Sequence, residues 1–430
     1  MLHAVVGLQF GDEGKGKFVD YLSSKLDGVA RFSGGANAGH SVQYKNTRLA
    51  FSQLPATLYG KDLYVCQGAL ISPKIILKEI KQVESMNNGA KIHIDPRCHI
   101  VLPIHAELNK ASEAYKTNNK IGSVGIGIGA CFEDKANRHG VRLCDAIDIN
   151  TLKEKLLFLW EIRKNQINNV FNGSLSLDFE QTLSELHEQC MKLKPYFSFT
   201  NKDIRKKLNS GEKILLETSQ ATFLDNGFGS YPFTVAYPTL VQNCFPLIGI
   251  PAQEIHVVGV FKCYMIRVGN GPFPTEISSH LADYIRKKGN EYGTVSKRER
   301  RCGWLDLPLI KQAVELNGVT ELAITNVDVL SELDEVYVCV DHQHKGEKIC
   351  CDQSMLHFSE VEPMYRSFDG WTKLKNKYIN KNELPENLIK FLKFIESYIG
   401  IPIKYISHGP DREHTIIDEA IYTLNNSSCL

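Results

Sequence analysis

Short apolar runs alternate with longer segments of helical spacing along most of the chain. Runs rich in β-branched residues and bounded by Gly, Pro or polar clusters predict strands at Ala4–Leu8, Gly28–Phe32, Asp62–Cys66, Lys91–Ile94, Lys213–Glu217, Glu254–Val260, Glu321–Thr325 and Pro402–Ile406. Helical spacing predicts helices at Pro73–Glu84, Ile104–Tyr115, Leu152–Lys164, Leu177–Lys194, Leu307–Leu316 and Leu388–Tyr398. Because helices separate strands that are apolar almost throughout, the pattern predicts an α/β fold with a predominantly parallel central sheet covered by helices.

The same pattern bears on domain organisation. The chain shows no repeat of fixed period, no low-complexity tract and no Pro/Ser-rich linker. We therefore expect residues 1–430 to form a single domain. Two long helical patterns follow one another without a strand between about residues 149 and 204, which predicts a helical excursion from that domain.

Composition and charge limit the classes of molecule that the protein is expected to bind. The 430 residues carry 50 Lys and Arg against 49 Asp and Glu, a formal net charge of +1, so no global field attracts nucleic acid or an anionic membrane. The 12 cysteines include no CxxC pair, which favours reduced thiols and the cytoplasm. The first strand follows Met1 without a charged leader, and no apolar run is long enough to span a bilayer, so neither secretion nor membrane insertion is expected.

The loop Gly11–Lys17, with the sequence GDEGKGK, follows the first predicted strand and opens a helical pattern from Phe18 to Leu26. Free N–H groups at a helix start, the helix dipole and two ammonium groups all favour phosphate oxygens, so we predict a phosphate-binding loop. It is not a Walker loop, because Phe18 stands where a Ser or Thr would bind magnesium. Asp12 would repel phosphates unless it binds a metal ion or takes part in proton transfer. The alternative is a glycine turn with exposed charges.

Three further segments could carry chemistry. Gly34–His40 follows the second strand, where parallel sheets place ligand loops, and His40 could donate a proton; the alternative is a turn that ends in a surface histidine. The basic run Lys297–Trp304 could bind phosphate or carboxylate oxygens, or be a solvated charge run. Asp328, after the strand Glu321–Thr325, could accept hydrogen bonds from guanine, or cap a helix.

Taken together, these segments resemble the adenylosuccinate synthetase family, the GTP-dependent ligases that join aspartate to IMP. The resemblance spans the chain almost end to end. It rests on the sequences GDEGKGK at Gly11–Lys17, NAGH at Asn37–His40, IGIGACFEDK at Ile126–Lys135, RVGNGPFPTE at Arg267–Glu276, RRCGWLD at Arg300–Asp306 and GPDR at Gly409–Arg412.

The resemblance implies a reaction in two steps. Asp12 takes the N1 proton of IMP while the 6-oxygen attacks the γ-phosphate of GTP, and the amine of aspartate then displaces the 6-phosphate. His40, Lys15 and Gln220 are implied as the other catalytic residues, with Mg²⁺ bound by Asp12 and by the main-chain carbonyl of Gly39. The expected products are adenylosuccinate, GDP and phosphate.

The resemblance also implies binding residues. Those for GTP are Gly11, Glu13, Gly14, Lys15, Gly16, Lys17, Asp328, Ser407 and Gly409. Those for IMP are Asn37, Ser123, Arg138, Gln220 and Arg298, and those for aspartate are Ser296, Arg298 and Arg300. The implied assembly is a homodimer in which Arg138 reaches the IMP site of the partner subunit.

The chain departs from the family pattern mainly near the acceptor. Val124 and Val235 stand where threonine hydroxyls contact the IMP phosphate, and Ile126 replaces an arginine. Near the guanine, Asn326 replaces a lysine. Two alternatives to an IMP–aspartate ligase therefore stay open: a paralogous ligase for another purine monophosphate or amino acid, and a catalytically silent GTP-binding protein.

Overall fold

The computed structural model describes residues 1–44, 47–117, 120–293 and 299–418, and one large sheet organises them. Its strands lie in the order β18 (Thr415–Ile417), β17 (Ile403–Ser407), β13 (Glu321–Thr325), β10 (Ile255–Lys262), β1 (Leu2–Gly7), β9 (Ile214–Ala221), β2 (Gly28–Arg31), β5 (Asp62–Val65) and β7 (Lys91–Ile94). All neighbours are parallel except β17 and β18. Every strand predicted from the sequence lies in this sheet, so the predicted fold class is confirmed.

Both faces of the sheet are buried, as the apolar strands predict. Along β1, Leu2, Ala4 and Val6 belong to one hydrophobic cluster and Val5 to another. The predicted helices are found within a few residues of their expected bounds. They are α2 (Pro73–Ser85), α3 (Pro103–Tyr115), α5 (Ile149–Asn165), α6 (Phe179–Leu193), α10 (Leu307–Asn317) and α12 (Glu386–Ile399).

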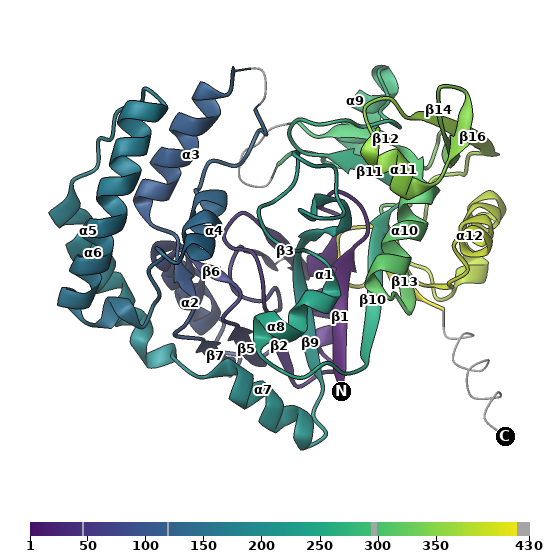
Figure 1. Cartoon of the computed structure of the whole chain (residues 1–430). Helices are drawn as coiled ribbons and strands as arrows, with labels where there is room; N and C mark the ends of the chain where they lie inside the picture. Colours follow the sequence, from purple (N-terminus) through teal and green to yellow (C-terminus); the bar gives the residue numbers. More distant parts are fainter. Residues whose placement is uncertain (45–46, 118–119, 294–298, 419–430) are drawn as a thin grey trace.

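A second, smaller sheet was not predicted. It contains β11 (Tyr264–Arg267), β12 (Arg301–Asp306), β14 (Glu335–His344), β15 (Glu347–Ile349) and β16 (Glu362–Asp369), and lies with α9 (His280–Lys288) and α11 (Cys351–Leu356) at the upper right of Figure 1. Most side chains of β16 are exposed. β16 therefore lacks the apolar run by which buried strands are recognised, whereas β11 and β12 are buried almost throughout.

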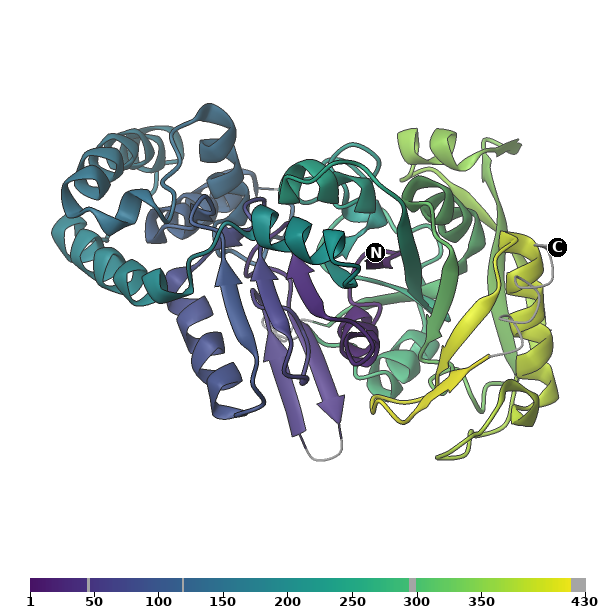
Figure 2. The same ribbon diagram turned by 90° about the horizontal axis from the view of Figure 1, so that it is seen from below.

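The remaining elements are short. The hairpin of β3 (His40–Tyr44) and β4 (Thr47–Phe51) projects from the body of the molecule in Figure 2. The others are β6 (Leu70–Ile71), β8 (His99–Ile100), α4 (Ile128–Asn137), the π-helical turn η3 (Gln166–Val170), α7 (Thr200–Asn209) and α8 (Cys244–Ile248). Within the described ranges, no helix combines the length and the apolar character needed to cross a membrane.

Candidate active site

A cavity of about 410 Å³ opens beyond the carboxyl ends of the central strands, where parallel sheets bind their ligands. The segments that line it follow β1, β2 and β9, which are neighbours in the sheet. The cavity brings together many of the predicted site residues: Gly11, Asp12, Lys15, Asn37, Gly39, His40, Ser123 and Gln220.

The loop Gly11–Lys17 is folded by its own glutamate. The carboxylate of Glu13 is fully buried and accepts hydrogen bonds from the backbone of Gly11 (2.8 Å) and from Lys15 Nζ (2.8 Å). Gly14 has a φ of 95° and caps α1 (Lys15–Ser23), which starts three residues before the helix predicted from Phe18. The side chain of Glu13 therefore shapes the loop, while binding of phosphate by Lys15 and the start of α1 stays a prediction.

Lys17 joins the loop to the segment after β17. Its ammonium group donates to Ser407 Oγ (2.7 Å), to the carbonyl of Gly409 (2.8 Å) and to the carbonyl of His414 (3.0 Å). Burial lowers the pKa of Lys17 to about 7, although Asp328 favours its charged form. Three residues predicted to bind GTP, far apart in the sequence, therefore form one cluster.

Asp328 lies beside this cluster and follows β13. Its Oδ1 is buried and has no hydrogen-bond partner within the described ranges. Burial raises the pKa of its carboxyl group, and Lys17 is among the groups that act in the opposite direction. Asp328 thus offers an unused acceptor to a ligand that carries N–H groups, as guanine does.

His40 is held by a glutamate that sequence reasoning missed. Its Nδ1 contacts Glu217 Oε1, and Glu217 also accepts from the backbone N–H of Ala56 (2.8 Å). Burial lowers the pKa of His40, while the Glu217 carboxylate acts to raise it. Since Nδ1 is engaged, Nε2 is the ring nitrogen left for a ligand. The sequence feature that could have identified Glu217 is a glutamate at the end of an otherwise apolar strand.

Asn37 and Gln220 also line the cavity. Gln220 Nε2 donates to the carbonyl of Asn37 (3.2 Å), and the buried Oδ1 of Asn37 has no partner in the described part of the chain. Ser123 Oγ pairs with Asn109 (2.9 Å). Val124, Ile126 and Val235 line the same cavity, so these three departures from the family pattern do face it.

Asp12 is paired with the arginine predicted to bind aspartate. Its Oδ2 lies 2.6 Å from Arg300 Nη2, and its side chain keeps 34% of its exposure while that of Arg300 keeps 8%. Asp12 adopts a φ of 60°, which is strained for a residue other than glycine. The other predicted aspartate-binding residues, Ser296 and Arg298, lie outside the described residues.

The donor set around Asp12 suits a hard cation. The cavity is lined by the carboxylate of Asp12 and by Gly39, whose main-chain carbonyl is a second oxygen donor. Mg²⁺ prefers oxygen ligands and takes few of them from protein, leaving the rest to water and phosphate. Lys15 nearby would share the charge of such phosphate oxygens.

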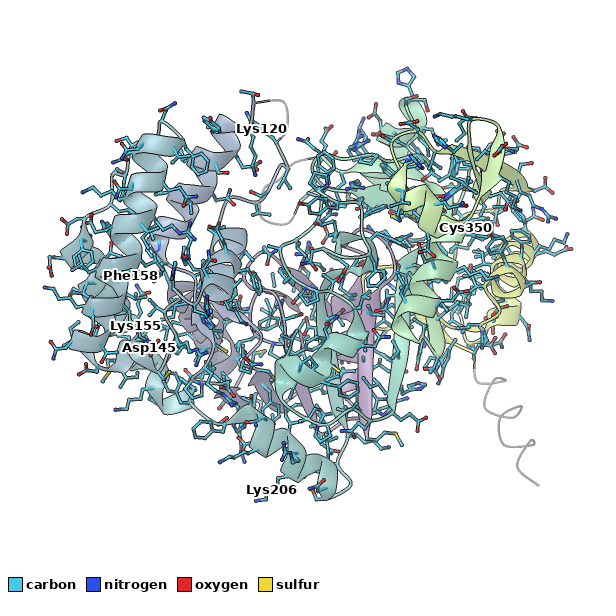
Figure 3. The ribbon with its side chains drawn as sticks, viewed as in Figure 1. Lys120, Asp145, Lys155, Phe158, Lys206 and Cys350 are labelled. Carbon is cyan, nitrogen blue, oxygen red and sulfur yellow. The ribbon has the colours of Figure 1, made fainter. Side chains whose placement is uncertain are left out.

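Arg138 does not line the cavity of its own chain. It ends α4 with a φ of 66° and is exposed. The adjacent residue, His139, packs edge-on against Phe158 at a ring-centroid distance of 5.2 Å. Phe158 is 56% exposed and lies in the helical layer at the left of Figure 3.

Other motif arginines hold loops together. Arg267 is buried and donates to Ser230 Oγ (2.7 Å) and to the carbonyl of Pro272 (2.8 Å), so its side chain stabilises the loop Arg267–Glu276. Arg412 binds Asp20 of α1 and thereby fixes the segment after β17. Both arginines are positioned by protein groups, although the buried Nε of Arg267 has no partner among the described residues.

Comparison with known proteins agrees with this geometry. The family profile described as adenylosuccinate synthetase matches residues 4–416. The chain is 63% identical to adenylosuccinate synthetase 1 of Photorhabdus laumondii over 97% of this chain and 100% of that protein. It is 38% identical to adenylosuccinate synthetase of Acetivibrio thermocellus over 96% and 98% of the two chains. The structure of fully ligated adenylosuccinate synthetase from Plasmodium falciparum matches with a TM-score of 0.90 and 33% identity, covering 97% and 99% of the chains. The chain belongs to the adenylosuccinate synthetase family.

Proposed function

We propose that this protein joins L-aspartate to IMP at the expense of GTP, forming adenylosuccinate, GDP and phosphate through a 6-phosphoryl-IMP intermediate. The observation that carries the proposal is that a chain matching the family from end to end gathers Asp12, Lys15, His40 and Gln220 around one cavity. The apolar lining near the acceptor is the observation behind a ligase for another acceptor, but the 63% identity to an adenylosuccinate synthetase favours IMP. A silent GTP-binding protein would not need the buried His40–Glu217 pair.

Each group has a role suited to its place. Asp12 takes the N1 proton of IMP, which makes the 6-oxygen a better nucleophile towards the γ-phosphate of GTP. His40 Nε2 supplies a hydrogen bond where negative charge develops, and Lys15 holds phosphate oxygens with the N–H groups at the start of α1. Gln220 orients the purine. Mg²⁺, held by Asp12 and Gly39, would neutralise phosphate charge.

The GTP side of the site extends from the loop to the end of β13. Gly14 and Gly16 offer backbone N–H groups to the phosphates, and Gly11 and Glu13 belong to the same turn, which the hydrogen bond from the Gly11 N–H to the Glu13 carboxylate shapes. Towards the base, Lys17, Ser407 and Gly409 border the place of guanine, and Asp328 accepts from its N1–H and 2-amino groups.

On the acceptor side, some of the proposed residues belong to the described part of the chain and others do not. Asn37, Ser123 and Gln220 face IMP, and Arg300 binds a carboxylate of aspartate in a forked pair. Arg298 and Ser296 are assigned to the same substrates from the sequence alone, because they lie outside the described residues.

The proposed assembly is a homodimer in which Arg138 contacts the IMP phosphate of the partner subunit. It is supported by the exposure of Arg138 outside its own cavity and by the exposed Leu157 and Phe158 on α5 nearby. We further propose that residues 1–430 form one domain with a helical excursion at about 149–204. A cytoplasmic location is supported by the free thiols of every cysteine in the described ranges.

A phosphate-release panel tests the activity. The protein is incubated with Mg²⁺, L-aspartate, GTP or ATP, and IMP, GMP or their deoxy forms, and the products are identified by mass spectrometry. We expect adenylosuccinate only with IMP, with GTP as the preferred donor. Turnover of another monophosphate without turnover of IMP would establish the paralogous ligase, and GTP binding without phosphate release would establish the silent protein.

A further inference from the structure

Arg300 is held more firmly than a surface arginine awaiting a substrate. Its backbone N–H donates to the carbonyl of Glu291 (3.0 Å), and its own carbonyl accepts from Arg286 Nε (3.1 Å). Its guanidinium donates through Nη1 to Glu291 Oε2 (2.9 Å). Glu291 therefore forms hydrogen bonds with both the main chain and the side chain of Arg300.

Glu291 is itself locked in place. The residue is fully buried, and its other carboxylate oxygen, Oε1, receives Lys262 Nζ and the hydroxyl of Tyr264. Lys262 ends β10 of the central sheet and Tyr264 begins β11 of the smaller sheet. A buried carboxylate with partners on both oxygens is a rigid anchor, and here the anchor is tied to both sheets.

The guanidinium of Arg300 has one edge that is only half used. Nε and Nη2 lie on the same edge and form the fork that binds a carboxylate in two parallel hydrogen bonds. In this structure Nη2 meets Asp12 Oδ2 at 2.6 Å, whereas Nε is buried and has no partner among the described residues. A buried donor without a partner is rare, and it indicates a missing acceptor.

We propose that Glu291 is a positioning residue that fixes the guanidinium of Arg300 with its Nε and Nη2 edge presented to the carboxylate of the amino-acid substrate. The inference rests on the proposed function, because it assigns that carboxylate to aspartate. Without substrate, Asp12 occupies half of this edge. When the substrate carboxylate takes both donors, Asp12 is released from Arg300, and Glu291 keeps its hold on Nη1 throughout.

The variant Glu291→Gln tests this role, since it removes the charge and keeps the size of the side chain. We expect the KM for L-aspartate to rise about tenfold or more, with kcat and the KM values for GTP and IMP changed by less than about threefold. Tyr264→Phe is the matched control. It removes a partner of Glu291 that does not touch Arg300, and should leave the KM for aspartate within about twofold.

A structural role alone would give a different result. Loss of folded protein would lower the apparent kcat with every KM unchanged, and that outcome overturns the inference. Should Glu291→Gln fail to fold, Glu291→Asp keeps the charge but withdraws the carboxylate by one methylene. It should still raise the KM for aspartate about threefold to tenfold, and an unchanged value would overturn the inference.

Calorimetry with L-aspartate separates this inference from the proposed function. If the wild-type protein makes adenylosuccinate and Glu291→Gln binds aspartate as well as wild type does, the positioning role is wrong and the function stands. If the wild-type protein makes no adenylosuccinate but loses aspartate affinity on Glu291→Gln, the function is wrong and the positioning role stands. If the wild-type protein neither makes adenylosuccinate nor binds aspartate, both are wrong.

Discussion

Two groups of site residues, called here the phosphate wall and the acceptor wall, differ in how their polar groups are satisfied. In the phosphate wall, which is the loop Gly11–Lys17 with the residues bonded to it, Lys15 pairs with Glu13, and Lys17 has three oxygen acceptors. In the acceptor wall, Asn37 Oδ1 is buried without a partner in the described part of the chain, and the side chains of Val124 and Val235 bring no hydrogen-bonding group at all. The ammonium groups of the phosphate wall therefore have partners before a ligand arrives, whereas the acceptor wall keeps an unpaired acceptor.

This difference separates chemistry from specificity. Groups held by internal hydrogen bonds are already oriented, so binding and catalysis need little reorganisation. A wall with unpaired or apolar groups depends on the ligand for its hydrogen bonds. A substitution there changes the affinity for the ligand by the contribution of about one hydrogen bond. Substitutions on the phosphate side should therefore affect turnover strongly, and those on the acceptor side should adjust the KM for IMP.

The largest effect is expected at Asp12. Asp12→Asn removes the base that takes the N1 proton, so kcat should fall by about a thousandfold or more. GTP affinity, measured by calorimetry, should change much less, because Lys15 and the loop N–H groups remain. Turnover within tenfold of wild type would show that Asp12 is not the base and would remove the strongest distinction between the two walls.

The next effect is expected at Glu217. Glu217→Gln leaves His40 with a neutral partner that can accept or donate, so the tautomer and charge of the imidazole are no longer fixed. We expect kcat to fall by about a hundredfold with little change in any KM. Thr218→Val is the control on the same strand, since Thr218 bonds the carbonyl of Val5 instead. An equal loss in both variants would mean that β9 matters only for stability.

Asp328, whose buried Oδ1 has no partner among the described residues, tests how the site recognises the base. Asp328→Asn lacks the carboxylate that would accept hydrogen bonds from both N–H groups of guanine. A hydrogen bond to a charged group contributes about 1.5–3 kcal/mol. The ratio of kcat/KM for GTP over ATP should therefore fall by about ten- to a hundredfold. The KM for IMP is the internal control and should not change. An unchanged ratio would place guanine recognition elsewhere.

The sequence predicted the large sheet and the centre of the cavity for physical reasons. Strands buried on both faces are apolar throughout, and the loop Gly11–Lys17 needs its glycines and lysines at fixed spacing. The exposed strand β16 carries no such pattern. Glu217 and Glu291 were missed because their roles depend on contacts across the fold: each is an ordinary glutamate in the sequence and becomes significant only beside His40 or Arg300.

The charge of Lys17 offers a test by pH. With a pKa of about 7, Lys17 is protonated below pH 7 and loses its charge as the pH rises above it. Between pH 7 and 9 the KM for GTP should rise about five- to tenfold, because a neutral amine attracts the nucleotide less than a cation does. Lys17→Arg stays charged across this range and should flatten the profile. The KM for IMP should not rise over this pH range. A parallel rise would mean that one titrating group affects both the phosphate wall and the acceptor wall.

The smallest effect is expected from completing the acceptor wall. Val235→Thr places a hydroxyl in the cavity at nearly constant volume, and one hydrogen bond to the IMP phosphate contributes about 0.5–1.5 kcal/mol. The KM for IMP should fall about two- to fivefold with kcat unchanged, and Val124→Thr should act in the same direction. Val42→Thr, in the buried core of the β3–β4 hairpin, is the control for a general effect of the hydroxyl. If Val235→Thr raises the KM for IMP instead, Val235 contacts an apolar part of the acceptor. The acceptor wall would then be adapted to its ligand as it is.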